Sequence, residues 1–243
     1  MQEPFSIEFA NGLTAKALHL QPNADLAATL ESFELSSPRP TIAIVGGASK
    51  ISEADRERLR SLFLHVLAPL AESFNAGVVD GGTDAGVMQM MGEARWKTGA
   101  TFPLIGVAPV GLATLPQQTA TAEDAAPLEP HHTHFLLVPG SQWGDESPWI
   151  AATASHLSRG LPSVTVLING GEITWTDAQC SVAAKRSIVV IAGSGRTADI
   201  LVAAVNGTVT DDRAPALVES GLLQAVDLED PEKLDRVLRQ ILA

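Results

Sequence analysis

Three glycine-rich segments of this sequence could bind the phosphate groups of a small molecule. Each follows a short apolar run, and together they contain the candidate contacts Gly46, Gly47, Gly81, Gly82, Thr83, Asp84, Gly86, Gly193, Ser194, Gly195 and Arg196. Glycine lets backbone amides approach phosphate oxygens closely, and the N-terminus of a following helix adds roughly half a positive charge. One such segment can equally be a tight strand-to-helix turn, so the prediction depends on the presence of three.

The polar side chains of these segments have more than one interpretation. Arg196 can bind two phosphate oxygens through parallel hydrogen bonds. Thr83 and Ser194 can donate hydroxyl protons to phosphate or cap a helix. Asp84 and Asp199 fall in the first turns of expected helices, where a carboxylate stabilises the helix dipole, binds a ribose hydroxyl or takes part in catalysis. No segment matches the dinucleotide fingerprint or the P-loop, which disfavours a standard dehydrogenase or ATPase.

A group of histidines and one glutamate supply further candidates. Alternation along a strand places His132 and His134 on the same face, beside His131. A catalytic zinc site would need a third ligand, and no Glu or Cys stands at a recognised spacing, so we expect no metal and no other cofactor. We interpret His134 as a ligand contact, with a core histidine as the alternative. Glu146 could meet a ribose, or simply lie exposed at a helix start.

The elements that would position these residues alternate between strands and helices. The expected strands are 41–45, 77–79, 104–108, 134–138, 163–168 and 187–191, and residues 117–130 are expected to form a surface loop near the strand ends. This alternation predicts an α/β fold, a Rossmann-like three-layer sandwich with a mostly parallel central sheet. Residues 5–9 and 13–20 flank Asn11-Gly12 and predict a small N-terminal β-hairpin. We therefore divide the chain into residues 1–40, a hairpin and helix packed on the core, and 41–243, the Rossmann-like domain.

Composition narrows the classes of partner. The 243 residues carry 16 basic and 28 acidic side chains, and the net charge of −12 would repel nucleic acid. No long apolar stretch predicts a membrane span, and the N-terminal residues do not resemble a secretion signal. Cys180 is the single cysteine and predicts a structural thiol. We expect a cytoplasmic protein that binds a small molecule through local amides and a few cations.

The order of these segments resembles the SLOG superfamily and, within it, the LSDAT branch found in the N-terminal cytoplasmic region of melastatin-type TRP channels. The resemblance rests on residues 79–88, 105–109, 131–138 and 191–201 and covers the chain from about residue 41 to 205. It implies a domain that binds a nucleotide-derived signal, with ADP-ribose and related NAD products as leading candidates. A free-standing, prokaryote-like sensor is the simplest interpretation, and family analogy adds a homodimer as a candidate assembly.

Two alternatives stay open. Another SLOG branch comprises cytokinin-activating phosphoribohydrolases, which cleave a nucleoside monophosphate to base and ribose phosphate. The resemblance to that branch implies a catalytic glutamate, but the nearest position here is the shorter Asp199, so Asp199 or Glu146 would have to serve in a hydrolase. A scaffold that binds no ligand is the third possibility, in which the same glycines are only turns.

Overall fold

The structure is a computed structural model that describes residues 3–35, 38–47, 52–120 and 122–243. Within these residues, the centre of the protein is one nine-stranded sheet. The strand order is β1-β2-β8-β5-β4-β3-β9-β10-β11. The antiparallel hairpin β1/β2 lies at one edge, and every other neighbouring pair is parallel. The strands are β1 (Phe5–Glu8), β2 (Thr14–His19), β3 (Thr41–Gly46), β4 (Gly77–Asp80), β5 (Leu104–Pro109), β8 (His134–Val138), β9 (Ser163–Ile168), β10 (Ser187–Ala192) and β11 (Leu223–Asp227).

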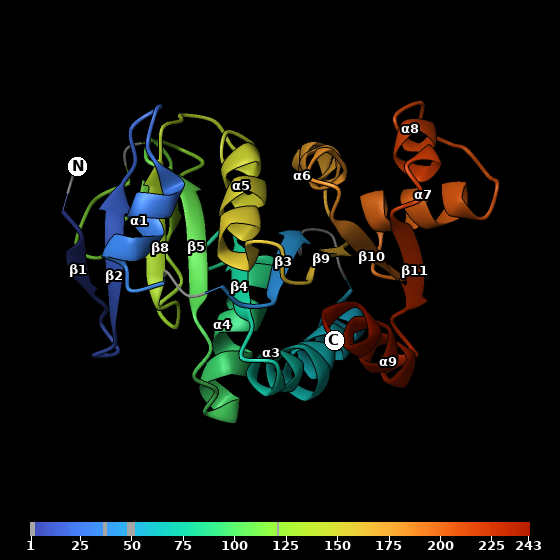
Figure 1. The fold of residues 1–243 in the computed structure, drawn as a ribbon, viewed down its shortest axis with the longest axis horizontal. Helices are drawn as coiled ribbons and strands as arrows, with labels where there is room; N and C mark the ends of the chain where they lie inside the picture. Colours follow the sequence, from blue (N-terminus) through green and yellow to red (C-terminus); the bar gives the residue numbers. More distant parts are fainter. Residues whose placement is uncertain (1–2, 36–37, 48–51, 121) are drawn as a thin grey trace.

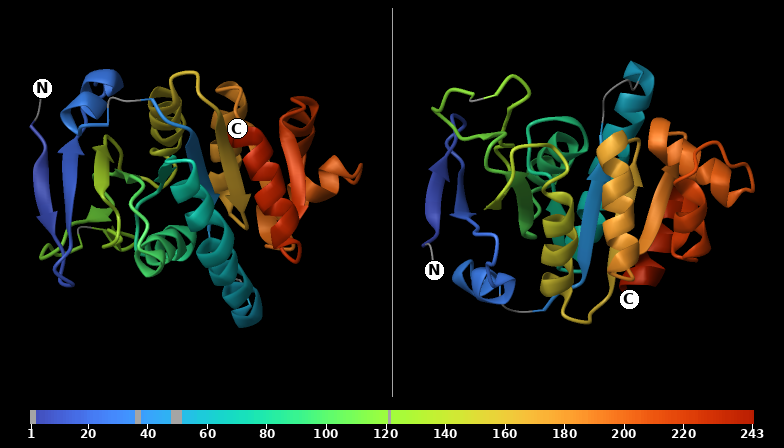
Figure 2. Two further views of the ribbon diagram at one scale, coloured as in Figure 1. Left: turned by 60° about the horizontal axis from the view of Figure 1, so that its bottom comes forward. Right: turned by 90° about the horizontal axis from the view of Figure 1, so that it is seen from above.

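Helices cover both faces of this sheet (Figures 1 and 2). One layer contains α1 (Leu26–Ser32), α5 (Ser147–Ser158), α6 (Glu172–Ala183), α7 (Arg196–Val205) and α8 (Ala214–Glu219). The other contains α2 (Glu53–Leu62), the π-helix η1 (Phe63–Leu67), α3 (Ala68–Ser73), α4 (Gly86–Thr98) and α9 (Pro231–Leu242). These layers confirm the predicted three-layer sandwich. Within the described residues, no helix is long and apolar enough to cross a membrane.

Alternation along the buried strands explains the two layers. Ile42 and Ile44 of β3 pack into the core under α2, α3, α4 and α9. Ala43 and Val45 pack into the core under α5, α6 and α7. Successive side chains of a strand point to opposite faces, so a strand covered on both sides reads as a continuous apolar run. The sequence could therefore locate the central strands within a residue or two.

The hairpin and its neighbours form a third apolar cluster. Ile7 and Phe9 pack with Phe135 and Leu137 of β8, and β2 pairs directly with β8 in parallel register. The predicted hairpin is therefore confirmed, and it extends the same sheet as the core. The division of the chain at residue 40 stays a prediction.

Two parts of the fold differ from the expectation. The edge strand β11 was not anticipated, because its half-exposed residues lack the apolar run of the central strands. The predicted loop 117–130 contains β7 (Ala126–Pro127), which pairs with β6 (Ala113–Thr114). Its last part is also not at the surface, since Leu128 and Glu129 are buried. Polar composition suggested a surface loop, but contacts from distant residues bury its end.

Candidate functional site

A cleft of about 480 Å³ opens where the direction of strand succession reverses. From β3 the sheet continues through β4 and β5 on one side and through β9 and β10 on the other. Ligands of open α/β sheets bind outside the carboxyl ends of the strands at such a reversal. Of the sequence-predicted residues, the cleft is lined by Gly46, Gly47, Gly81, Thr83, Arg196 and Glu146.

The first glycine segment approaches the neighbouring strand closely. Gly46 has a φ of +131°, and a Cβ there would overlap the carbonyl oxygen of Ile168 at the end of β9. The next residue, Gly47, donates its backbone N–H to that same carbonyl at 3.2 Å. This contact holds the first loop against the end of β9. The rest of the predicted segment, Ala48, Ser49 and Lys50, lies outside the described residues.

A fourth glycine loop, which the sequence analysis missed, follows β9. It contains Asn169, Gly170 and Gly171, and α6 begins immediately after it. Gly171 lines the cleft, and its N–H donates to the Thr174 hydroxyl at 3.2 Å. The signal was available in the sequence, because Asn169 and then two glycines follow the apolar run 163–168. This loop brings the N-terminus of a twelve-residue helix to the cleft.

The third predicted segment is tied to this fourth loop. The Ser194 hydroxyl donates to the carbonyl of Ile191 at 2.6 Å and accepts the N–H of Asn169 at 2.8 Å. Ser194 is buried and therefore braces the loops. Asp199 is exposed and accepts the N–H of Gly193 at 2.7 Å. Ser194, Asp199, Gly193 and Gly195 do not line the cleft.

Arg196 of the same segment does reach the cleft. It is the first residue of α7 and has an exposed side chain. Its Nη2 lies over the Cα of Gly171, since a Cβ on Gly171 would come within 2.8 Å of that nitrogen. The guanidinium therefore lies beside the N-terminus of α6. A cation and a helix N-terminus at one place favour a bound anion.

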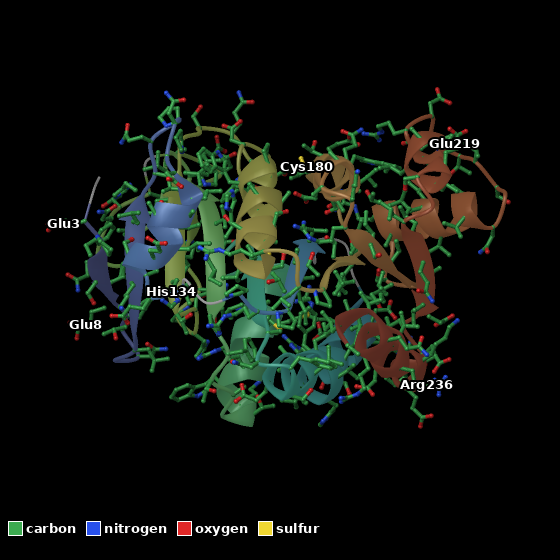
Figure 3. The ribbon with its side chains drawn as sticks, in the orientation of Figure 1. Glu3, Glu8, His134, Cys180, Glu219 and Arg236 are labelled. Atoms are coloured by element: carbon green, nitrogen blue, oxygen red, sulfur yellow. The ribbon has the colours of Figure 1, made fainter. Side chains whose placement is uncertain are left out.

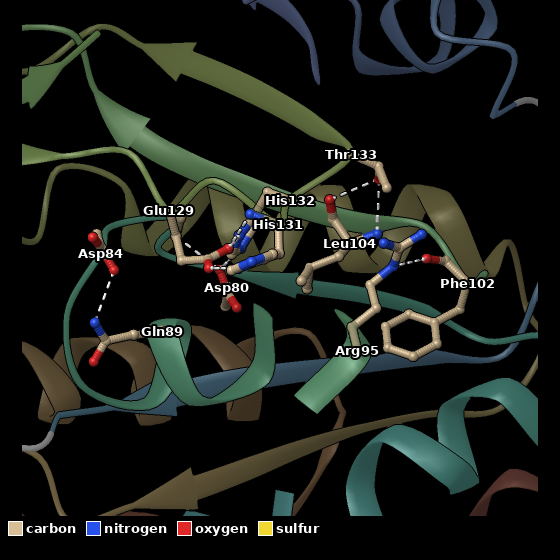
Figure 4. Close-up of polar contacts among 11 residues, drawn as sticks. Asp80, Asp84, Gln89, Arg95, Phe102, Leu104, Glu129, His131, His132 and Thr133 are labelled. Carbon is tan, nitrogen blue, oxygen red and sulfur yellow. Dashed lines mark hydrogen bonds and ion pairs between the residues drawn. The ribbon is translucent and has the colours of Figure 1, made fainter. Parts of the chain in front are cut away.

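The second segment divides between cleft and core. Gly81 and Thr83 line the cleft. Gly82 is buried instead, with a φ of +67°, and its missing Cβ would come within 2.7 Å of the Gly106 Cα. Asp84 accepts a hydrogen bond from the Gln89 amide at 2.9 Å (Figure 4). Neither Asp84 nor Gly86 lines the cleft. Gly82 thus serves strand packing rather than close approach of a ligand.

Two buried carboxyl groups occupy the wall of the cleft between α5 and α6. Glu146 precedes α5 and Asp177 lies in α6, and each is only 7% exposed. Burial raises the pKa of Glu146, whose carboxylate accepts the N–H of Gly144 at 2.8 Å. Burial also raises the pKa of Asp177 to about 7; the Ser147 hydroxyl opposes this rise and the charge of Glu146 adds to it. The sequence pattern indicated Glu146 but not Asp177, because an acidic residue in a helix carries no signal of burial.

His134 lies apart from the glycine loops. It is the first residue of β8, whereas the loops follow the last residues of their strands (Figure 3). Its ring packs on Phe33 with 5.2 Å between centroids, and its Nδ1 lies 2.8 Å from the Thr133 hydroxyl. Burial, together with the charge of Lys16, lowers its pKa to about 4. The structure therefore does not bring His134 to the cleft.

His132 belongs to a buried charged network beside the second glycine segment (Figure 4). Its ring nitrogens lie 2.8 Å from Oδ1 of Asp80 and 2.8 Å from Oε2 of Glu129. Glu129 also accepts the backbone N–H of His131 at 2.8 Å. These side chains bond to one another, and among the described residues no set of three or more His, Cys, Asp or Glu could hold a metal ion.

Comparisons with known proteins agree with this architecture. The model of a family described as SLOG in TRPM, prokaryote, matches residues 39–236. A transient receptor potential cation channel subfamily M member-like 2 from Nematostella vectensis is 27% identical over 256 residues, covering 90% of this chain and 16% of the channel. The subfamily M member 2 channel of Mus musculus is 27% identical over 207 residues, covering 70% of this chain and 14% of the channel.

A solved structure shares the fold. The X-ray structure of TM1055, a structural genomics target, superposes with a TM-score of 0.55 at 17% identity. The match covers 83% of this chain and 99% of that chain. At this identity the similarity establishes the fold alone.

Proposed function

This chain belongs to the prokaryotic branch of the SLOG domains found in TRPM channels, and from that premise we propose that it binds a nucleotide-derived small molecule, ADP-ribose or a related product of NAD, in the cleft described above. The observation that carries the proposal is the convergence of Gly47, Gly81, Gly171 and Arg196 on one cleft at the reversal of strand order. The phosphates would lie over these glycines, beside the N-terminus of α6.

Local groups, rather than overall charge, must attract the phosphates. The chain carries a net charge of −12, so its long-range field opposes an anion. Arg196 provides a positive charge at the cleft, the N-terminus of α6 adds a partial one, and the glycines leave room for phosphate oxygens to approach. The N–H groups of Gly47 and Gly171 themselves already donate to the Ile168 carbonyl and the Thr174 hydroxyl.

The proposal concerns the domain and not the channels. The chain spans 16% and 14% of the two channels named above, so ion conduction does not transfer with the similarity. What transfers is the expectation of a domain that recognises a nucleotide-derived ligand. A sensor that binds the ligand without changing it is the simplest form of that expectation.

Hydrolysis of an N-glycosidic bond is the second candidate, and the position of Glu146 favours it. Glu146 is buried in the cleft and its pKa is raised, as expected for a carboxyl group that exchanges protons with a substrate. Water would add its hydroxyl to C1 of the ribose, and its proton would leave with the base. Asp199 does not support this candidate, because it accepts a hydrogen bond from Gly193 and does not line the cleft.

A proton NMR time course would test both candidates. The purified protein would be mixed separately with ADP-ribose, NAD, cyclic ADP-ribose and AMP. Broadened ligand signals without new base or sugar signals would support the sensor, whereas free base with ribose phosphate would support the hydrolase. Unchanged spectra for all four compounds would contradict binding of this ligand class and leave the scaffold interpretation.

A further inference from the structure

The cleft contains a second region, whose chemistry differs from that of the glycine loops. Between α5 and α6 it is lined by Ile150, Ile173 and Trp143, together with the carboxyl groups of Glu146 and Asp177. Trp143 donates its indole N–H to the Asp124 carbonyl at 3.1 Å, which fixes the ring in place. Asp124, Glu172 and the side chains of Thr83 and Thr174 line the same cleft. An apolar and aromatic lining with a few placed polar groups is typical of a small-molecule pocket.

Asp177 has an unused oxygen in this region. Its side chain is 7% exposed, and neither its Oδ1 nor the neighbouring Ser147 hydroxyl has a hydrogen-bond partner of good geometry among the described residues. A buried polar atom without a partner costs on the order of 1 to 3 kcal/mol, so such atoms are normally satisfied by water or by a ligand. Asp177 lines the cleft, and a rotation of its side chain would present this buried oxygen to a bound molecule.

Resting on the proposed function, we propose that the region between α5 and α6 holds the base of the ligand, where the Asp177 carboxyl group recognises an adenine edge. The carboxyl group donates one hydrogen bond to the ring nitrogen and accepts one from the exocyclic amine. The phosphates then lie toward Gly171 and Arg196. No covalent step is involved. Asp177 is a specificity-determining residue in this arrangement.

The groups around Asp177 favour its protonated form. Burial is the main cause of its raised pKa, and the charge of Glu146 from α5 acts in the same direction. Burial and the charge of Asp177 raise the pKa of Cys180, which lies one turn further along α6. Asp124 from the loop before β7 lines the same cleft and adds negative charge.

Two cations near this region, among the described residues, interact with a different acid. The charges of Arg196 from α7 and Arg213 from α8 lower the pKa of Glu172. Arg213 also pairs with Asp211 at 2.8 Å. Neither cation contributes to the pKa of Asp177, which is about 7, so a large share of this carboxyl group carries a proton at neutral pH.

The protonation state decides which base fits. A protonated carboxyl group offers one donor beside one acceptor, which matches the acceptor N1 and the donor amine of adenine. An ionised carboxylate offers only acceptors, which match the two adjacent donors of guanine. The buried, acidic surroundings of Asp177 thus select adenine at or below neutral pH.

Calorimetric titration with ADP-ribose and with GDP-ribose tests this inference. The diphosphate bridges of ADP-ribose and GDP-ribose keep the same charge between pH 6 and pH 8, so a change of affinity over this range reports on the protein. We expect ADP-ribose to bind about tenfold more weakly at pH 8 than at pH 6, because only about one tenth of a group with this pKa is protonated at pH 8. We also expect GDP-ribose to bind more weakly than ADP-ribose at pH 6.

Three variants separate recognition from folding. Asp177→Asn keeps one donor and one acceptor, so its affinity for ADP-ribose should no longer depend on pH. Glu146→Gln removes a neighbouring negative charge and should lower the pH at which affinity falls. Glu232→Gln changes an exposed acid at the start of α9, in the opposite helix layer, and is the matched control that should behave as wild type. Melting curves for all variants would report folding independently.

The outcomes distinguish this inference from the proposed function. Equal binding of ADP-ribose and GDP-ribose, with the same pH dependence in wild type and Asp177→Asn, would overturn the base subsite while leaving the proposed function intact. Failure of wild-type protein to bind ADP-ribose, GDP-ribose and ribose 5-phosphate would overturn both. Binding of ribose 5-phosphate that is unchanged in Asp177→Asn is expected, because this probe has no base.

Discussion

Nε2 of His132 lies 2.8 Å from Oδ1 of Asp80, and the same carboxylate oxygen accepts the N–H of Gly82 at 2.7 Å. The last residue of β4 therefore connects the buried histidine to the second glycine segment. Glu129, from the end of the 117–130 loop, holds the other side of the imidazole ring. Two carboxylates on one buried ring favour its charged form. This network fixes the backbone from which Gly81 and Thr83 reach the cleft.

Stability should decrease as the pH rises above neutral. Burial opposes the charge of His132, but Asp80 and Glu129 outweigh it and raise the pKa to about 9. The pKa of histidine in the unfolded chain is about 6.5. A histidine whose pKa is raised in the folded protein contributes stability that is fully present below that pH and is lost as the pH rises through about 9. We expect the free energy of unfolding, from urea titrations, to fall by on the order of 3 kcal/mol between pH 6.5 and pH 9.5.

Two variants isolate this contribution. His132→Gln should unfold more easily by about 3 to 5 kcal/mol at pH 6.5, because it leaves two buried carboxylates without their partner. Its stability should also lose most of the pH dependence above 6.5. His65→Gln removes an exposed histidine and should keep the wild-type profile. An unchanged pH profile in His132→Gln would show that the ring is not charged in the folded protein.

Gly81 and Gly82 should respond differently to the same substitution. Gly82→Ala should destabilise the fold, because φ is +67° and the new methyl group would come within 2.7 Å of the Gly106 Cα. Gly81→Ala should fold, because its methyl group would meet only Met88 at 3.8 Å. If the proposed cleft binds ligand, Gly81→Ala should weaken ADP-ribose binding while its melting temperature stays near wild type. The reverse pattern would contradict these assignments.

The contrast between these two glycines shows what the sequence could predict. The apolar runs located the central strands, because a strand buried on both faces needs such a run. The glycine segments were located correctly after strands, but the pattern could not tell which glycine faces a ligand. That choice depends on a distant residue, such as Gly106 beneath Gly82. Sequence alone contains no record of that proximity.

The candidate site was predictable to a similar extent. Arg196 and Glu146 line the cleft, and their roles there stay predictions, whereas His134 does not line it, because it starts its strand instead of following it. Asp177 was missed because burial of a helical acid depends on the packing of α5 against α6. Glu129 was missed because it comes from a segment whose composition is that of an exposed loop.

Removal of the Arg196 guanidinium should weaken ligand binding without affecting the fold. The side chain is exposed and lies over Gly171 at the cleft. We expect Arg196→Ala to bind ADP-ribose more weakly by about 1.5 to 3 kcal/mol, the range for hydrogen bonds to charged groups. Arg236→Ala changes an exposed arginine on α9, well away from α6 and α7, and is the matched control (Figure 3). Equal affinities in calorimetry for wild type and Arg196→Ala would remove Arg196 from the site.

Gly171→Ala should act through Arg196. The backbone of Gly171 has a φ of −127° and a ψ of −148°, at the edge of the extended region, so the substitution avoids the left-handed strain expected at Gly82. Its methyl group would come within 2.8 Å of Nη2 of Arg196 and would push the flexible guanidinium aside. We therefore expect a melting temperature near wild type and ADP-ribose binding that is weaker by about 1 to 3 kcal/mol.

A double-mutant cycle would identify the route of this effect. Once Arg196 is already alanine, the methyl group at position 171 has no guanidinium to displace. Gly171→Ala should then cost little further affinity, so the two substitutions should be clearly non-additive, as expected for residues in direct contact. Additive losses would mean that the methyl group blocks the ligand directly. In that case Gly171 itself, rather than the orientation of Arg196, would define the phosphate position at the N-terminus of α6.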